Sequence, residues 1–248
     1  MAAHLNPGRE GSSPVERLRA KLARDEPLVV VNADHPSASF VEVLARQPID
    51  IVFIDCEQGS PDVESVENMA RAARLHSMAS VVRVFSPADW VLERYLFRGV
   101  DGVVVPRVDR AEDARRVVES VRYCYPRDPV GKFVSVQIET VNAVEELDDF
   151  LAVEGVDVYF IGPVDLAKSM GHEGDFRAPE VQRVMDEVIE RARAAGRHTG
   201  ILTNYENAAD YVAKGVRFLY IHANDFVASG ARTFAERTAA PGSAAGQE

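Results

Sequence analysis

The feature that most constrains the fold is an alternation of short apolar runs with longer amphipathic segments along nearly the whole chain. The runs are at most seven residues long and rich in β-branched residues, which is typical of parallel strands covered on both faces. Eight such runs occupy residues 28–32, 51–55, 80–84, 102–106, 133–139, 157–162, 198–203 and 218–222.

The segments between these runs carry apolar residues at helical spacing, most clearly in 61–73, 111–121 and 179–195. Eight strands alternating with helices in 248 residues predict an α/β protein with a single (β/α)8 TIM-barrel domain. We place the barrel at 13–238, between flexible tails at 1–12 and 239–248. An open doubly wound sheet is the alternative, but it would ordinarily carry a phosphate-binding loop, and no GxGxxG or GxxxxGK[ST] motif is present.

Composition excludes several classes of function. The chain has 28 basic and 39 acidic residues, and this net charge of −11 disfavours a nucleic-acid-binding protein. No apolar run approaches the roughly 20 residues of a membrane span, and the N-terminal residues lack the apolar core of a secretory signal. Cys56 and Cys124 form neither a disulfide framework nor a zinc-binding pattern. We therefore expect a reduced, cytoplasmic protein.

Active sites of such barrels lie at the carboxyl ends of the strands, and the predicted strand 133–139 ends in a carboxylate. Its residues alternate, so that Ser135, Gln137 and Glu139 share one side. Burying Glu139 without a partner would be costly, so a cation is implied. The alternative is that Glu139 caps the helix that follows.

The next strand along the chain is followed by Gly162, Pro163 and Asp165. The glycine lets backbone approach a ligand closely, and the proline suits the first turn of a helix. Asp165 would then lie over the barrel mouth near Glu139. Two carboxylates on adjacent strand ends make the oxygen site that Mg²⁺ or Mn²⁺ prefers. The alternative is that Asp165 only complements a helix dipole.

Charged residues also end two earlier strands. Arg83 lies in 80–84, and its planar guanidinium matches a substrate carboxylate. The alternative is a structural ion pair of Arg83 with Asp55 or Glu57. These two acids lie on the same side at the end of 51–55, although a surface loop would also explain them.

Together these motifs resemble the HpcH/HpaI aldolase family, which contains metal-dependent (class II) pyruvate aldolases built on a (β/α)8 barrel. The resemblance runs from about residue 50 to residue 225. It rests on FIDCEQG (53–59), VVRV (81–84), GVDGVVVPRV (99–108), VQIET (136–140) and FIGPVDLAKSMG (160–171). The most specific part is VQIET followed by IGPxDL at this spacing.

The resemblance implies that Glu139 and Asp165 bind a divalent metal, Mg²⁺ foremost with Mn²⁺ or Co²⁺ as alternatives. Arg83 would bind a 2-oxo acid, and Gln137 would line the same pocket. The metal would act as a Lewis acid that stabilises an enolate. The second substrate would be an aldehyde or another electrophile, and the protein would be a homo-oligomer, a trimer or a hexamer. The other end of the oxo acid would meet the backbone of Gly162, Pro163, Val164 and Asp165.

The chain departs from the family pattern in two places. Family members usually carry a His, the expected acid/base, where this chain has Gln58, and a neighbouring acid corresponding to Asp55 supports that His. A Gln amide cannot accept a proton near neutral pH, so Gln58 can only orient water or substrate. His35 or His222, after the first and eighth strands, is the alternative base, although a lone His is more often structural. The connection 123–133 is also shorter than expected.

Three functions remain open. The first is an aldolase that makes or breaks a bond beside a pyruvate-type enolate. The second is a decarboxylase of oxaloacetate type, or a carbon–carbon-forming synthase similar to macrophomate synthase or a siderophore-pathway citrate synthase. Decarboxylation needs only the metal as electron sink, so Gln58 would be tolerated there. The third is a catalytically reduced metabolite-binding barrel, which the presence of Arg83, Glu139 and Asp165 together disfavours.

Overall fold

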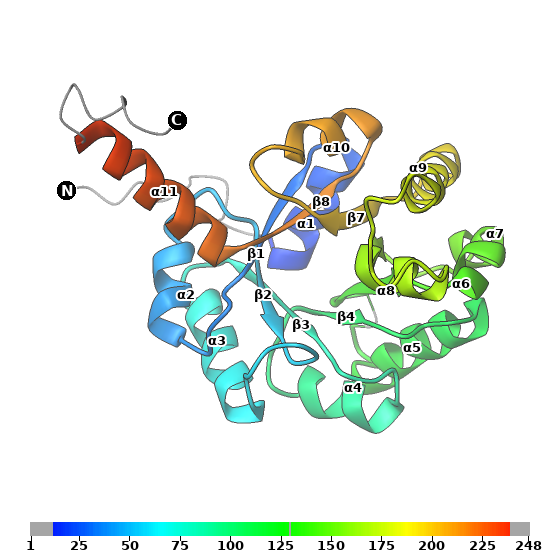
Figure 1. The fold of residues 1–248 in the computed structure, drawn as a ribbon. Coiled ribbons are helices and arrows are strands. Elements are labelled where there is room, and N and C mark those ends of the chain that lie inside the picture. Colours follow the sequence, from blue (N-terminus) through cyan, green and yellow to red (C-terminus); the bar gives the residue numbers. More distant parts are fainter. Residues whose placement is uncertain (1–11, 129, 239–248) are drawn as a thin grey trace, which may run out of the picture.

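The computed structural model describes residues 12–128 and 130–238, in which eight parallel strands close into a barrel in chain order (Figure 1). The predicted TIM barrel is confirmed, and the alternative of an open sheet is wrong because β8 pairs with β1 along its whole length. The strands are β1 Leu28–Asn32, β2 Ile51–Asp55, β3 Ala79–Arg83, β4 Gly102–Val105, β5 Phe133–Ile138, β6 Val158–Ile161, β7 Thr199–Leu202 and β8 Phe218–His222.

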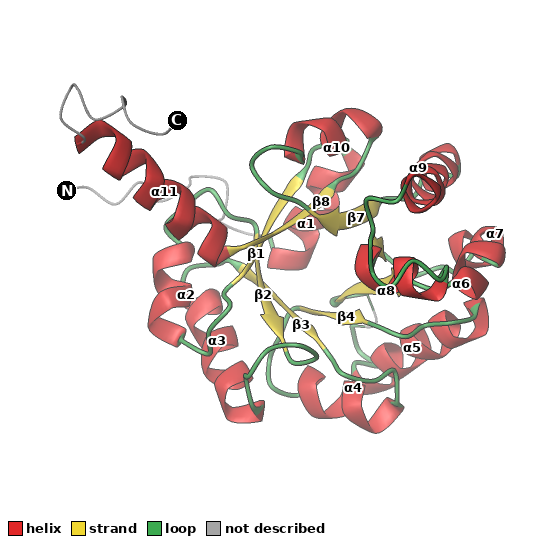
Figure 2. Ribbon diagram, viewed as in Figure 1, coloured by secondary structure: helices red, strands yellow, loops and turns green. Residues whose placement is uncertain are grey.

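Helices surround the barrel (Figure 2). They are α1 Pro14–Ala23, α2 Ala38–Leu44, α3 Val63–Leu75, α4 Asp89–Leu96, α5 Ala111–Cys124, α6 Val141–Glu145, α7 Leu147–Leu151, α8 Pro163–Ser169, α9 Pro179–Ala194, α10 Ala208–Lys214 and α11 Ala223–Thr238. Within the described ranges, no helix is both long and apolar enough to cross a membrane. The tails predicted at 1–12 and 239–248 lie outside the described residues, apart from Ser12.

The core has two layers, because successive residues of each strand point to opposite faces. The inner layer fills the barrel with side chains such as Phe53, Phe133 and Phe218, and α1 packs into the same cluster with Val15 and Leu18. The outer layer lies between the strands and the surrounding helices. Helix α1 packs at one end of the barrel, and the polar carboxyl ends of the strands lie at the other end, which we call the mouth.

Predicted element ends differ from the observed ones by a few residues. The predicted strand 80–84 is one residue earlier, at Ala79–Arg83, and the predicted helix 61–73 begins at Val63, after Asp62 caps the amide of Ser65 at 2.8 Å. The helix expected after the strand 133–139 is two short helices, α6 and α7, that meet at Glu146. These shifts move no residue of the barrel mouth away from it.

Candidate active site

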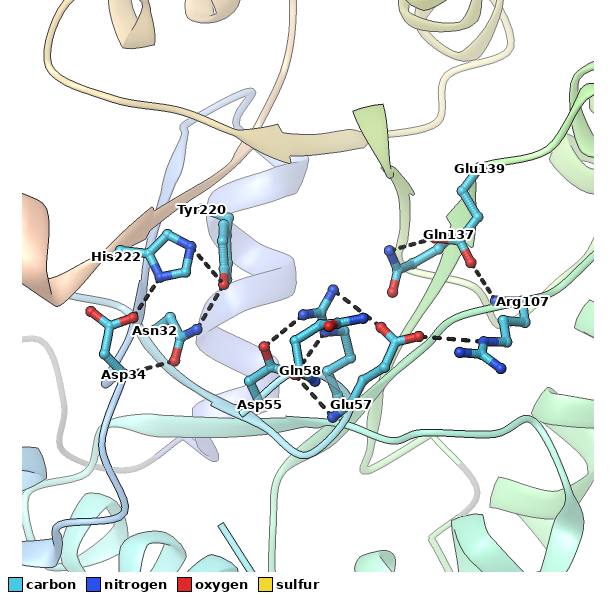
Figure 3. Close-up of polar contacts among 11 residues, drawn as sticks. Asn32, Asp34, Asp55, Glu57, Gln58, Arg107, Gln137, Glu139, Tyr220 and His222 are labelled. Atoms are coloured by element: carbon cyan, nitrogen blue, oxygen red, sulfur yellow. Dashed lines mark hydrogen bonds and ion pairs between the residues drawn. The ribbon is translucent and has the colours of Figure 1, made fainter. Parts of the chain in front are cut away.

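The carboxyl ends of β2, β3, β5 and β6 meet at one mouth of the barrel. Figure 3 shows the candidate side chains that β2 and β5 place there. Parallel pairing sets Asp55 of β2 directly beside Arg83 of β3. Gln137 lies in β5 with Glu139 directly after that strand, and Gly162 follows β6. Because the strands are staggered in register around a closed barrel, residues far apart in sequence line one cavity.

Arg83 and Asp55 form a bidentate ion pair. The guanidinium donates from Nε to Asp55 Oδ1 at 2.9 Å and from Nη2 to Oδ2 at 2.6 Å, and only 16% and 7% of the two side chains are exposed. Burial alone would raise the pKa of Asp55, but Arg83 and the amides of Glu57 and Gln58 outweigh it and lower that pKa. The ion pair considered from the sequence is therefore present, and it fixes the orientation of Arg83.

Glu57 connects this pair to Arg107. Its carboxylate lies 3.3 Å from Nη1 of Arg83 and 3.5 Å from Nε of Arg107. Burial raises the pKa of Glu57, although both arginines oppose that shift. Arg107 holds a left-handed backbone conformation, with φ of 57°, and points its amide into the mouth. Sequence reasoning assigned no role to Arg107, although it lies within the GVDGVVVPRV motif.

Glu139 is a buried carboxylate held by neutral groups. It accepts a hydrogen bond from the amide of Arg107 at 2.6 Å and another from Nε2 of Gln137 at 2.9 Å (Figure 3). Burial raises its pKa to about 7, and the nearby carboxylates of Glu57 and Asp165 add to the shift. Capping of the next helix, the alternative weighed from the sequence, is wrong, because Thr140 caps α6.

The surroundings of Glu139 fit a hard divalent cation. Oε1 of Gln137 is buried and finds no hydrogen-bond partner among the described residues. Gly162 leaves space at the same point, because a Cβ there would lie 2.7 Å from Oε2 of Glu139. A buried carboxylate with a raised pKa beside an unpaired amide oxygen is stabilised by a cation that takes oxygen ligands.

Asp165 lies in the first turn of α8, and its side chain is 53% exposed and 2.9 Å from Nζ of Lys168. Its negative charge adds to the raised pKa of Glu139. Its place in the first turn fits the helix-dipole alternative, and metal binding by Asp165 stays a prediction. Of the neighbouring backbone positions, Gly162 and Pro163 are buried and Val164 is exposed. Across 12–128 and 130–238, no three His, Cys, Asp or Glu side chains form a complete metal-binding group.

A second polar cluster lies across the mouth, at the ends of β1 and β8 (Figure 3). Nδ1 of His222 is 2.5 Å from Oδ1 of Asp34, and the hydroxyl of Tyr220 accepts a hydrogen bond from Asn32 at 2.7 Å. Of these, only His222 was considered from the sequence. The signal was weak because the contacts join the first and last strands, which become neighbours only when the barrel closes.

Comparison with known proteins agrees with this geometry. The family model described as HpcH/HpaI aldolase/citrate lyase matches residues 30–228. A hydroxypyruvate/pyruvate aldolase of Agrobacterium fabrum is 33% identical over 237 residues, which cover 86% of this chain and 89% of the relative. A 2-keto-3-deoxy-L-rhamnonate aldolase of Escherichia coli K12 is 29% identical, over 82% of this chain and 85% of the relative.

Solved structures give the same result. The crystal structure of an HpcH/HpaI aldolase/citrate lyase family protein from Burkholderia cenocepacia superposes with a TM-score of 0.80 and 27% identity, over 89% of this chain and 98% of the other. The family match over 30–228 includes the carboxyl end of every strand of the barrel. From the barrel, the polar mouth and these matches together, the chain belongs to the HpcH/HpaI aldolase/citrate lyase family.

Proposed function

We propose that this protein is a divalent-metal-dependent carbon–carbon lyase, an aldolase that cleaves or forms the bond next to the enolate of a pyruvate-type 2-oxo acid. The observation that carries the proposal is the buried Glu139 carboxylate beside the unpaired Oε1 of Gln137, in a mouth that also holds the oriented guanidinium of Arg83. Two relatives with aldolase names, over 82% or more of the chain, support the same reaction class.

Glu139 and Asp165 would hold the metal, with Mg²⁺ as the first candidate and Mn²⁺ or Co²⁺ as alternatives. When bound, the ion would supply Lewis-acid stabilisation of the charge that develops on the oxo-acid oxygen. Gln137 would line the pocket and hold the Glu139 carboxylate in place. Gly162 would leave room for the oxo acid beside Glu139, where any side chain would intrude.

Arg83 would bind the 2-oxo acid with the donors that its ion pairs leave free. A guanidinium has five N–H groups, and the contacts with Asp55 and Glu57 use three of them, which leaves two for a substrate oxygen. Asp55 would act by fixing the orientation of this fork rather than by touching substrate. The backbone N–H of Gln58 donates to Asp55, which holds the loop after β2 in place. The side chain of Gln58 would orient water or substrate from that loop.

A second function from the same enolate chemistry is favoured by one observation, the presence of Gln58 where the family usually carries His. Decarboxylation of oxaloacetate requires no base to remove a hydroxyl proton, so this site would support it without His at position 58. A synthase that joins the enolate to another electrophile would share that property. Both uses depend on the same residues, Arg83, Glu139 and Asp165.

The test is release of pyruvate from 4-hydroxy-2-oxopentanoate and from oxaloacetate, each with Mg²⁺ or Mn²⁺ and with excess chelator. Turnover that requires the metal, is lost in E139Q and is retained in E145Q supports the proposal. Glu145 is the matched control because it is exposed on α6, outside the mouth. Unchanged turnover after the metal has been removed contradicts the proposal. Tight metal binding with no turnover of either acid also contradicts it and favours a metabolite-binding barrel.

A further inference from the structure

A histidine–aspartate pair lies across the barrel mouth from Glu139, at the ends of β8 and β1 (Figure 3). Nδ1 of His222 is 2.5 Å from Oδ1 of Asp34, whose side chain is only 8% exposed, while 40% of the His222 side chain is exposed. The other carboxylate oxygen of Asp34 accepts a hydrogen bond from the backbone N–H of Asn224 at 2.7 Å. The carboxylate is thus fully oriented, and the imidazole reaches into accessible space.

The hydrogen bonds select one tautomer of His222. A proton on Nδ1 is donated to the Asp34 carboxylate, which leaves Nε2 as an acceptor. Nε2 lies 3.4 Å from the hydroxyl of Tyr220, which already accepts from Asn32 at 2.7 Å and so has its proton free to donate. The backbone N–H of Asp34 donates to Oδ1 of Asn32 at 2.9 Å, so Asn32 bonds to both Tyr220 and Asp34.

The backbone of Asp34 is held in an unfavourable conformation. Its φ is 61°, in the left-handed region that residues other than glycine rarely adopt. Asp tolerates this region better than most residues, and the bonds to His222, Asn224 and Asn32 hold Asp34 in it. The strand end is therefore shaped around the position of this carboxylate.

The pair opens onto a cavity of about 170 Å³ between the ends of β1, β2 and β8. This volume is below the range of a pocket for a drug-sized ligand, so it suits a small molecule or one end of a substrate. Its walls include both His222 with Asp34 and, from β2 and its loop, Asp55 with Gln58. The cavity therefore joins the His222 cluster to the ion pair that orients Arg83.

We propose that His222 is the general acid/base of the lyase reaction, that Asp34 positions it, and that the cavity beside Gln58 receives the aldehyde half of a short-chain 4-hydroxy-2-oxo acid. This rests on the proposed function above. The base then comes from the end of β8 rather than from the loop after β2. This explains how the site could work with Gln58, whose side chain cannot act as a base, in the position where the family usually carries His.

The proposed step balances protons and electrons. Nε2 of His222 exchanges its contact with the Tyr220 hydroxyl for one with the C4 hydroxyl and takes that proton as the C3–C4 bond breaks. The O–H electron pair becomes the second C–O bond of the aldehyde. The C3–C4 pair passes to the oxo-acid half as an enolate. The enolate then takes a proton at C3 from solvent, while His222 releases its proton to solvent. In the direction of bond formation, protonated His222 donates to the aldehyde oxygen.

The test compares two reactions of one enzyme in the variant H222N, whose amide can still donate to Asp34. Removal of a general base costs about 10²-fold or more, so cleavage of 4-hydroxy-2-oxopentanoate should fall by at least that factor. Decarboxylation of oxaloacetate, which has no hydroxyl proton to remove, should stay within about threefold, as should the dissociation constant for pyruvate measured by calorimetry. D34N should lower kcat for cleavage with little change in KM.

Two further variants separate catalysis from structure. H198N alters a histidine that lies beside α1, outside this cavity, and should leave both reactions near the wild-type level. Q58H, combined with H222N, should restore part of the lost cleavage, because it places a base on the opposite wall. Equal losses in both reactions with H222N, or an equal selective loss of cleavage in H198N, would overturn the role of His222. Absence of any metal-dependent turnover in the wild type would overturn the proposed function and this inference with it.

Discussion

At the scale of single residues, the Arg83–Asp55 pair shows how the mouth holds a guanidinium in one orientation before substrate binds. Both side chains are largely buried, and the bidentate geometry leaves the guanidinium one orientation. Removing one partner of such a pair leaves an uncompensated charge, which costs about 3–5 kcal/mol. Substitution by alanine would therefore mix a loss of stability with a loss of binding.

Arg83→Lys separates these effects. Lysine keeps the charge beside Asp55 but cannot donate in a fork, so substrate binding should suffer more than stability. We expect KM for the 2-oxo acid to rise by about tenfold or more, equivalent to about 1.4 kcal/mol, with a smaller change in kcat. Steady-state kinetics with oxaloacetate measure this, and unchanged KM and kcat would show that Arg83 does not bind the oxo acid.

The same pair predicts acid sensitivity. The pKa of Asp55 is lowered in the folded protein, because Arg83 and two amides outweigh burial. A depressed carboxyl pKa contributes stability at pH values above its unfolded value, about 3.9, and that contribution is lost as pH falls toward the folded value. The free energy of unfolding of the wild type should therefore decline more steeply below pH 4 than that of D55N. Parallel denaturation curves for the two proteins across this range would contradict the expectation.

Residue types and their places on strands could be predicted from the sequence, whereas their partners could not. The alternation in 133–139 gave Gln137 and Glu139 the same side, and both do face the mouth. Neither the amide of Arg107 on Glu139 nor the bond between Asp34 and His222 follows a local pattern. The first depends on a left-handed turn after β4, and the second on closure of β8 against β1.

At the scale of elements, the junction between β6 and α8 controls access to Glu139. A Cβ at Gly162 would lie 2.7 Å from Oε2 and 2.9 Å from Cβ of Glu139, closer than atoms pack. The contact is with the carboxylate that we propose as a metal ligand, so the junction must keep glycine even though its φ of −90° is open to other residues. Space, rather than backbone conformation, determines the residue here.

Gly162→Ala should therefore abolish most activity and weaken Mn²⁺ binding while the far-UV circular dichroism stays unchanged. The matched control is Gly230→Ala on α11, where an added Cβ meets nothing within 4 Å. Alanine in a helix is favoured over glycine by about 1 kcal/mol, so this control should keep activity and not lose stability. Full activity of G162A would mean that the oxo acid does not approach Glu139 from this side.

Strand and helix types could be predicted because buried parallel strands need continuous apolar runs, while each covering helix needs one apolar face. Ends were predicted less well, since a cap such as Asp62 or a break such as the one at Glu146 depends on hydrogen bonds to the backbone. Errors of this size do not move the site. A side chain at the carboxyl end of a strand stays at the mouth when the strand is one residue shorter.

At the scale of the whole molecule, α11 is the helix that packs least against the rest of its own chain. It extends away from the barrel (Figure 1), and only Ala223 of this helix is buried. Val227 and Phe234 expose 62% and 71% of their surface. Exposed apolar side chains gathered on one helix mark an interaction surface.

We expect the homo-oligomer predicted from the sequence to use this surface, so the wild type should exceed the mass of one 27.3-kDa chain in light scattering. Val227→Ser with Phe234→Ser should shift the distribution toward the monomer, because it removes apolar area from the contact. The matched control is Leu75→Ser with Tyr123→Ser, on α3 and α5, which also removes exposed apolar area but should leave the mass unchanged. A monomeric wild type at micromolar concentration would rule out this assembly.

Stabilisation of a 2-oxo acid enolate in the mouth around Glu139 is the central claim, and exchange of the methyl protons of pyruvate with deuterium in D₂O tests it most directly. This exchange, followed by proton NMR, requires enolate formation but no aldehyde, and so does not depend on the second substrate. We predict exchange well above the buffer rate with Mg²⁺ or Mn²⁺, lost with chelator and in E139Q. Exchange at the buffer rate in metal-loaded, pyruvate-saturated wild-type protein would contradict the account.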